Sequence, residues 1–219
     1  VIVSAVVTGS SVLAASSPTV SATVTVGGDP RGVAITPNGS YAYVTNADDG
    51  TVSVIDTGTN TVTATVSVGS IPSRVAITPN GSYAYVTNRG DATVSVIDTG
   101  TNQVTATVTG VGITPTGVAI TPNGSYVYVP SSDDSKVYVI DTGTNSVIDT
   151  VTVGWARGGN PQQVAITPDG SYAYVTNFNG STVDVIDTAT NQVTATVSLV
   201  SRGWGGAGAA GVAITPDGS

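Results

Sequence analysis

The chain contains no cysteine, histidine or methionine, and only 9% of its 219 residues are charged. Without cysteine and histidine it lacks disulfides, thiol chemistry, the usual zinc, copper and haem ligands, and any histidine-based catalytic triad. Glutamate is absent as well and Lys136 is the only lysine, so two good helix formers are nearly missing. No apolar run approaches the roughly 20 residues that a membrane-spanning helix needs.

What remains is rich in valine and threonine, punctuated by glycine and asparagine, a composition typical of an all-β protein. The net charge is −8 and the isoelectric point is about 4.1. Nucleic acid is therefore not expected as a partner, because its phosphates require a surface rich in lysine and arginine.

One segment, Val33–Asn46, returns almost unchanged along the chain. Further copies begin at Val75, Val118 and Val164, and a first half begins at Val212, so successive starts are separated by 42, 43, 46 and 48 residues. Each unit predicts four strands joined by tight turns and one variable hairpin loop. In the first unit these strands are Val33–Thr36, Tyr41–Thr45, Thr51–Ile55 and Thr61–Val68. Four-stranded units at this period predict the blades of a β-propeller, in one domain spanning residues 1–219.

The copies Tyr43–Asn46, Tyr85–Asn88 and Tyr174–Asn177 all read Y-V-T-N, and V-A-I-T-P-N/D-G and V-I-D-T segments flank them. With these motifs the chain resembles the YVTN family of β-propeller repeats, over residues 19–219. The resemblance implies a surface-layer-like or secreted protein and a ring of seven blades. The third unit departs from it at Pro130, where we expect a strand end or a bulge.

Both ends of the chain allow two interpretations. Residues 1–15 are either the remnant of a signal peptide or strand material. Thr19–Val26 matches the fourth strand of a unit, and residues 212–219 match a first strand. Residues 1–28 could complete the partial blade at 212–219, giving four complete blades and a composite fifth. Otherwise the chain is a fragment of a larger ring. We expect a monomer or, for a fragment, self-association through its open blade edges.

An antiparallel arrangement predicts that the tight turns share one face of the propeller and the variable loops share the other. Binding residues usually lie on such variable loops. Arg31, Arg74 and Gln163 vary where the surrounding segment does not, so they are candidate ligand contacts or tolerated loop positions. Two longer loops hold neighbouring aromatic and cationic residues, which is a common pairing in protein and carbohydrate recognition. These residues are Trp155, Arg157, Arg202 and Trp204.

Aspartates in the chain suggest two kinds of site, each with a simpler structural interpretation. The repeated Asp-Thr-Gly at Asp56, Asp98 and Asp141 resembles an aspartic-protease motif. Its recurrence in three units at blade spacing, with Ala189 replacing the glycine in the fourth, favours a turn. Aspartates in the hairpin loops are weak candidates for binding calcium, and solvated loop residues are the simpler interpretation. These are Asp48, Asp49, Asp91, Asp133 and Asp134.

The sequence thus favours a non-catalytic, secreted or cell-surface propeller that acts as a binding or scaffold module, with a protein or carbohydrate ligand and no required cofactor. The alternative is an enzyme of the lactonase, lyase or quinoprotein-like type, with its site at the mouth of the central channel. Such sites generally draw on histidine, glutamate or cysteine, all of which are absent.

Overall fold

A computed structural model describes residues 19–154, 159–199 and 208–218, and in these residues every regular element is a β-strand. This confirms the all-β class. No helix in the described part of the chain is long and apolar enough to cross a membrane. The strands form four separate antiparallel sheets, which we call blades 1 to 4.

Strand bounds follow the repeat closely. Blade 1 contains β1 (Pro30–Ile35), β2 (Tyr41–Asn46), β3 (Thr51–Asp56) and β4 (Thr61–Ser67). Blade 2 contains β5 (Pro72–Ile77), β6 (Tyr83–Asn88), β7 (Thr93–Asp98) and β8 (Gln103–Val108). Blade 3 contains β9 (Ala119–Ile120), β10 (Tyr126–Ser131), β11 (Lys136–Asp141) and β12 (Ser146–Thr152). Blade 4 contains β13 (Pro161–Ile166), β14 (Tyr172–Asn177), β15 (Thr182–Asp187) and β16 (Gln192–Ser198).

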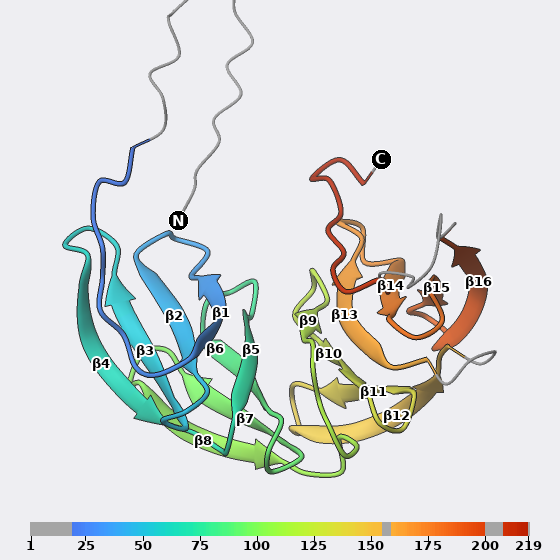
Figure 1. Cartoon of the computed structure of the whole chain (residues 1–219), viewed down its shortest axis with the longest axis horizontal. Coiled ribbons are helices and arrows are strands. Elements are labelled where there is room, and N and C mark those ends of the chain that lie inside the picture. Colours follow the sequence, from blue (N-terminus) through green and yellow to red (C-terminus); the bar gives the residue numbers. More distant parts are fainter. Residues whose placement is uncertain (1–18, 155–158, 200–207, 219) are drawn as a thin grey trace, which may run out of the picture.

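The four blades follow one another along an arc (Figure 1). The first strands β1, β5, β9 and β13 line its inner side, and consecutive members of this series contact each other. The fourth strands lie on the outer side, and blade 1 and blade 4 stand apart across the open side of the arc (Figure 1). This arrangement is part of a propeller whose circle the described residues do not close.

Hydrogen bonds define two faces of the arc. On the loop face, the hairpin between the second and third strands meets the segment that enters the blade, as Ala47 N–H donates to Asp29 O at 3.0 Å. On the turn face, the T-P-N/D-G turn meets the D-T turn, as Thr57 N–H donates to Ser40 O at 3.0 Å. The predicted separation of variable loops from tight turns is therefore confirmed.

The core lies between blades rather than within them. Tyr43, Val52, Val54 and Val66 on one face of blade 1 pack against the facing side of blade 2, which includes Val86. Equivalent clusters join blade 2 to blade 3 and blade 3 to blade 4. A single blade would leave both of its apolar faces in water, so each sheet depends on its neighbours.

A buried tyrosine strengthens each of these three junctions. The hydroxyl of the tyrosine in the second strand donates to the side-chain Oδ1 of an asparagine in the next blade. The pairs are Tyr43–Asn102 at 2.7 Å, Tyr85–Asn145 at 2.8 Å and Tyr128–Asn191 at 2.7 Å. Burial raises the pKa of each of these tyrosines to about 12. We call this contact the tyrosine latch.

The inner strands approach so closely that two positions require glycine. A Cβ on Gly32 would lie 2.8 Å from Ser73 O and 2.9 Å from the Cα of Arg74, both in the next blade. A Cβ on Gly117 would lie 2.9 Å from Gln162 O, also in the next blade. Blades 1 and 3 therefore carry glycine at a register position where blades 2 and 4 carry a long side chain.

Two expectations about strands were wrong. Thr19–Val26 is not a strand, because a fourth strand needs its own blade's third strand as a partner and no described residue supplies one. Residues 212–218 likewise form no strand, although their turn repeats the bond from glycine N–H to threonine O, here Gly218 to Thr215 at 2.9 Å. Residues 1–18 lie outside the described residues, so completion of a fifth blade stays a prediction.

The expected interruption at Pro130 was also wrong. β10 continues through Pro130 to Ser131 without a bulge, and Pro130 pairs with Val137 of β11. Pro130 instead affects β9, the strand on the other side of β10. β9 has only two residues, whereas the other first strands have six. Proline offers no N–H to a first strand, so the ladder there shortens. Thr116 compensates in part by donating its N–H to Pro130 O at 2.9 Å.

Substituting Gly32→Ala tests the close approach of blades 1 and 2. The added methyl group must push backbone apart, so we expect the free energy of unfolding to fall by about 1–3 kcal/mol. Gly211→Ala is the matched control, since it has the same place in the last repeat and its Cβ would meet nothing within 4 Å. Urea unfolding of the two variants compares them, and equal stability would show that the contact is not restrictive.

The tyrosine latch predicts a loss of stability in alkali. A tyrosine whose pKa is about 12 when folded and 10 when unfolded keeps its proton longer in the folded state, so stability is lost as pH rises from 10 to 12. Tyr85→Phe should lower the unfolding free energy at pH 7 by about 1 kcal/mol and weaken this alkaline dependence. Tyr83→Phe, at an exposed tyrosine, should do neither; denaturant unfolding from pH 7 to 12 measures both effects.

Candidate functional site

Both faces of the arc carry aspartates, but the described cations lie on one face only. Within the described ranges, all four cationic side chains belong to the loop face, at the start of a strand or in a hairpin loop. They are Arg31, Arg74, Arg89 and Lys136. The turn face bears carboxylates, and none of the four cations lies there. Its carboxylates in blades 1 to 4 are Asp56, Asp98, Asp141, Asp169 and Asp187.

Turn-face aspartates close the turns that contain them. Thr59 N–H donates to Asp56 Oδ1 at 2.8 Å, and the same bond recurs at Asp98 and Asp141. The bond from Thr59 lowers the pKa of Asp56, and the hydroxyl of Thr167 lowers that of Asp169. The interpretation of Asp-Thr-Gly as a turn is confirmed.

Loop-face aspartates hold the segments that cross from one blade to the next. Asp49 Oδ2 accepts a hydrogen bond from Gly28 N–H at 2.8 Å, and Asp91 Oδ2 accepts one from Ser70 N–H at 2.6 Å. Asp133 accepts from the Thr114 hydroxyl at 2.5 Å, and Asp134 accepts from the Tyr138 hydroxyl. The described residues contain no group of three acidic side chains placed to hold a metal ion. Calcium binding at these loops therefore stays a prediction.

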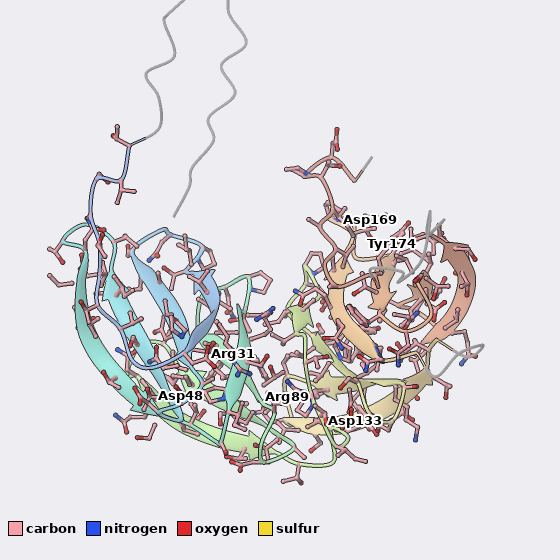
Figure 2. All side chains as sticks on the ribbon, viewed as in Figure 1. Arg31, Asp48, Arg89, Asp133, Asp169 and Tyr174 are labelled. Carbon is pink, nitrogen blue, oxygen red and sulfur yellow. The ribbon has the colours of Figure 1, made fainter. Side chains whose placement is uncertain are left out.

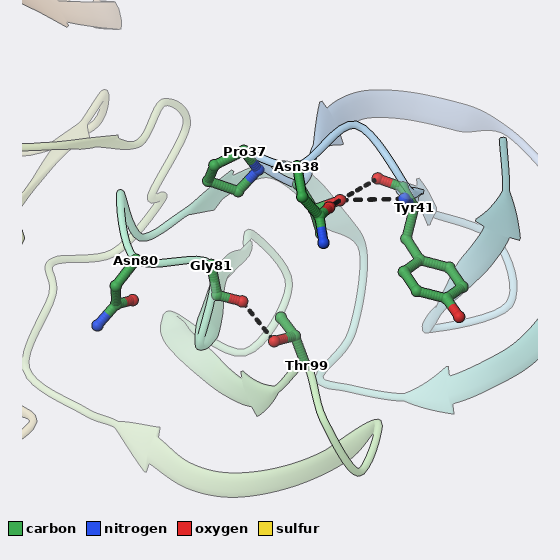
Figure 3. A pocket seen from close by; sticks show the side chains of 7 residues that line it. Pro37, Asn38, Tyr41, Asn80, Gly81 and Thr99 are labelled. Carbon is green, nitrogen blue, oxygen red and sulfur yellow. Dashed lines mark hydrogen bonds between the residues drawn. The ribbon is translucent and has the colours of Figure 1, made fainter.

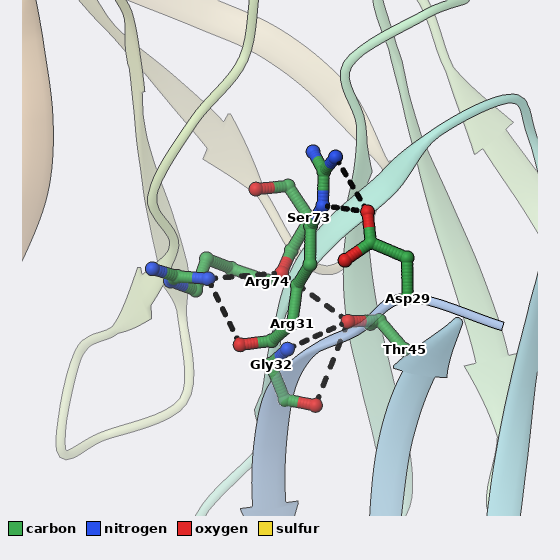
Figure 4. A network of polar contacts seen from close by, with 6 residues as sticks. All are labelled: Asp29, Arg31, Gly32, Thr45, Ser73 and Arg74. Atoms are coloured by element: carbon green, nitrogen blue, oxygen red, sulfur yellow. Dashed lines mark hydrogen bonds and ion pairs between the residues drawn. The ribbon is translucent and has the colours of Figure 1, made fainter. Parts of the chain in front are cut away.

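Arg31 lies on the inner side of the arc (Figure 2), and Arg74 of the next blade lies beside it (Figure 4). Arg31 forms an ion pair with Asp29 at 2.7 Å. The Arg74 Nη1 donates to Arg31 O at 3.1 Å and to Ser73 O at 3.3 Å. Thr45 Oγ1 completes the network by accepting from Gly32 N–H at 2.8 Å and contacting Ser73 O at 3.2 Å (Figure 4). Backbone carbonyls thus orient the Arg74 guanidinium, and no carboxylate in the described part of the chain pairs with it.

The remaining predicted site residues do not join this pair. Gln163 lies on β13 at the register position of Arg74, and its N–H donates to Thr176 Oγ1 at 3.1 Å. It belongs to blade 4, two blades beyond Arg74. Trp155, Arg157, Arg202 and Trp204 lie outside the described residues.

Two exposed loop-face residues were missed by the sequence interpretation. Arg89 follows β6 and Phe178 follows β14, so both occupy the first position of a hairpin loop. A Cβ on Gly208 would lie 2.2 Å from Phe178 O, so Gly208 packs against the hairpin loop that Phe178 begins. Phe178 is the only phenylalanine, and its place in a variable loop was the available signal.

The turn face also has recesses, which repeat between blades. A cavity of about 260 Å³ lies between blades 1 and 2, with Asn38 and Tyr41 on one side and Asn80, Gly81 and Thr99 on the other (Figure 3). A matching cavity of about 240 Å³ lies between blades 3 and 4. Most polar atoms drawn in Figure 3 form hydrogen bonds that hold the turns together. The Thr99 hydroxyl, for example, donates to Gly81 O at 2.5 Å.

Chemically, the loop face offers two cations held by other groups of the chain, Arg31 and Arg74. A general base at neutral pH needs a pKa near 7, which an aspartate reaches only when its pKa is raised. Hydrogen bonds lower the pKa of Asp56 and of Asp169, so these two turn-face carboxylates are poor general bases. The Arg74 guanidinium, held by two carbonyl groups, is arranged to bind an anionic group.

Comparison with known proteins supports the architecture. A family model described as "Lactonase, 7-bladed beta-propeller" matches residues 7–147 and again residues 118–219. Among solved structures, the chain is similar to Kuenenia stuttgartiensis hydrazine synthase, at 28% identity and a TM-score of 0.74. That match covers 84% of this chain and 53% of the other, so this chain spans about half the length of the structure it matches. The comparison with curated proteins gives no match.

The first of the two family matches alone covers more than half of the residues. The four antiparallel blades and the similar solved structure agree with it. The chain belongs to the lactonase family of seven-bladed β-propellers.

Proposed function

We propose that this chain is a non-catalytic binding or scaffold module of a secreted or cell-surface protein, and that it binds a protein or carbohydrate ligand through its loop face. The observation that carries this proposal is the placement of every described cation on that face. The loop face bears aspartates too, but four of them accept hydrogen bonds from neighbouring groups of that face, and no described carboxylate pairs with Arg74. An acidic ligand is therefore favoured at Arg74 rather than on the turn face, where no described cation lies.

Arg74 is the best anchored of these cations. Its guanidinium is held by two carbonyl groups, so it loses little side-chain entropy when it binds a carboxylate or sulfate group. Arg31 is adjacent but is already paired with Asp29, so it supports the site more weakly. The residues of the long loops, Trp155, Arg157, Arg202 and Trp204, are proposed as additional contacts from the sequence alone.

Binding to simple polyanions tests this function. We expect polygalacturonate and poly-L-glutamate to bind the chain in a salt-dependent manner, and neutral dextran not to bind. Arg74→Gln should weaken binding roughly tenfold, since a charge-assisted hydrogen bond contributes about 1.5–3 kcal/mol. Ser82→Asp is the control, because it makes the same change in net charge on the turn face and should have little effect. Isothermal titration calorimetry compares the variants.

Equal loss of affinity in both variants would indicate that only net charge matters, and would contradict a loop-face site. Absence of binding to either polyanion would contradict the proposed acidic ligand.

The competing function is that of a propeller enzyme, with a site at the inner mouth of the arc, and the lactonase family match favours it. Lactone hydrolysis needs a group that activates water or polarises the lactone carbonyl. Arg31 and Arg74 could polarise a carbonyl, but the chain has no histidine, glutamate or cysteine to act with them.

We expect glucono-1,5-lactone to hydrolyse at the same rate with the chain as in buffer alone, as followed by proton release at constant pH. A saturable acceleration that Arg74→Ala abolishes would instead support the enzyme.

A further inference from the structure

One hydrogen bond on the loop face brings the same two positions together in every blade. The residue that begins each hairpin loop donates its N–H to the carbonyl oxygen of the residue just before the proline that enters the blade. The bond measures 3.0 Å in blades 1, 2 and 3 and 3.1 Å in blade 4. Backbone geometry therefore holds these positions together while their side chains differ. We call them the entry pairs, and they are Asp29–Ala47, Ile71–Arg89, Thr114–Ser132 and Asn160–Phe178.

Ile71 has a backbone conformation that isoleucine rarely adopts. Its φ is 51°, in the left-handed region, and the matching residues Asp29 and Asn160 have φ values of 50° and 51°. Aspartate and asparagine tolerate this region, whereas a β-branched side chain crowds the backbone there. The repeat imposes the conformation, because Ile71 O accepts from Arg89 N–H just as its counterparts accept from theirs. Blade 2 therefore carries a local strain that the residues of blades 1 and 4 avoid.

Packing within the chain does not compensate for this strain. Ile71 is 40% exposed, and it belongs to none of the three apolar clusters that join the blades. Blade 2 has a blade on each side, so this exposure does not come from the ends of the arc (Figure 1). An asparagine would suit both the backbone and the solvent better. A strained and exposed aliphatic residue therefore points to contact with a molecule outside the chain.

Two cationic side chains accompany Ile71. Arg89 is its partner in the entry pair, and Arg74 follows it on β5. Arg89 is exposed, and its guanidinium forms no ion pair with any described carboxylate. The same holds for Arg74, whose guanidinium is held by two carbonyl groups. The loop face of blade 2 thus combines one aliphatic side chain with two guanidinium groups that no described carboxylate neutralises.

The other entry pairs lack this combination. In blade 1 the pair is Asp29–Ala47, and Asp29 is occupied by its ion pair with Arg31 at 2.7 Å. In blade 3 both members carry hydroxyl groups, and in blade 4 an amide accompanies an aromatic ring. Among the four described pairs, only Ile71–Arg89 joins an apolar group to a cation. Recognition of a ligand that is both acidic and apolar is therefore expected at blade 2.

We propose that the loop face of blade 2 binds an acidic segment of another protein, in which an aliphatic or aromatic side chain lies between carboxylates. The apolar side chain contacts Ile71, and the carboxylates pair with Arg74 and Arg89. This inference rests on the function proposed above for the loop face and narrows its ligand to a protein. An acidic carbohydrate would satisfy the two arginines, but it has no apolar side chain to cover Ile71.

Two peptides of equal length and charge test the proposal. One has a leucine flanked on both sides by glutamates, and the other has a serine in place of the leucine. In isothermal titration calorimetry we expect both to bind, and the leucine peptide to bind roughly tenfold more tightly, because it alone buries apolar surface against Ile71. Ile71→Asn should remove this difference and leave the affinity for the serine peptide unchanged.

Ile148→Asn is the matched control, since it removes an exposed isoleucine from β12 and should leave the difference between the peptides intact. Arg74→Gln and Arg89→Gln should each weaken both peptides by the same factor, because they act on carboxylates that the two peptides share. A leucine advantage that persists in Ile71→Asn would contradict the proposed site.

Failure of this inference differs from failure of the loop-face function. If neither peptide nor polygalacturonate binds, the loop-face function falls and the inference falls with it. If both peptides bind with equal affinity, the function stands and the role of Ile71 is overturned. Polygalacturonate that binds at least as tightly as the leucine peptide would overturn the protein ligand in favour of an acidic carbohydrate.

Stability gives a second readout, which a structural role of Ile71 would move in the opposite direction. Ile71→Asn should raise the urea concentration at the midpoint of unfolding while it lowers affinity for the leucine peptide, because asparagine fits the left-handed conformation. Asn160→Ile makes the reverse change at the matching position of blade 4 and should lower the midpoint. A lower midpoint in Ile71→Asn would show that the isoleucine stabilises the chain, and would overturn its assignment to binding.

Discussion

The structure depends on one constraint, which is that a four-stranded sheet with two apolar faces must cover both of them with other sheets. β6 illustrates it, because Tyr85 contributes to the cluster shared with blade 3 and Val86 to the cluster shared with blade 1. Neither face could remain in water, since each buried valine or tyrosine contributes about 1.5–3 kcal/mol through burial. The strands, turns and loops are arranged around this mutual coverage, and stability is shared between neighbours as in other repeat proteins.

The same arrangement separates the two faces of the arc in chemistry. On the turn face every repeated aspartate has a structural task within its own turn, as Asp56 has with Thr59, so these positions are uniform and acidic. The loop face is held by bonds between segments, such as Asp91 to Ser70, which leave the tips of the loops free to vary. All four described cations lie there, at loop positions or strand ends that differ from one repeat to the next.

Local pattern predicted the strands, the turns and the two faces, since alternation of valine with threonine and the Pro-Asn-Gly turn act over a few residues. It could not predict contacts between segments far apart in sequence. Asp49 caps Gly28 across 21 residues, and the approach of Gly32 to Arg74 joins different blades. Thr19–Val26 was predicted as a strand because its letters match β4, but pairing also requires a partner strand. Arg31 and Arg74 were singled out by their variation as candidate ligand contacts, and that role stays a prediction. Their hydrogen-bonded network was beyond what the sequence could indicate.

The alternation of glycine with a long side chain on the inner strands has a consequence for the family to which the chain belongs. Gly32, Arg74, Gly117, Gln163 and Gly211 follow one another at matching positions, a pattern with a period of two blades. The family has seven blades, and a period of two cannot close on an odd number. At one junction of such a ring two blades of the same kind must meet. A seven-bladed ring built from these repeats therefore has one junction unlike the others on its inner side.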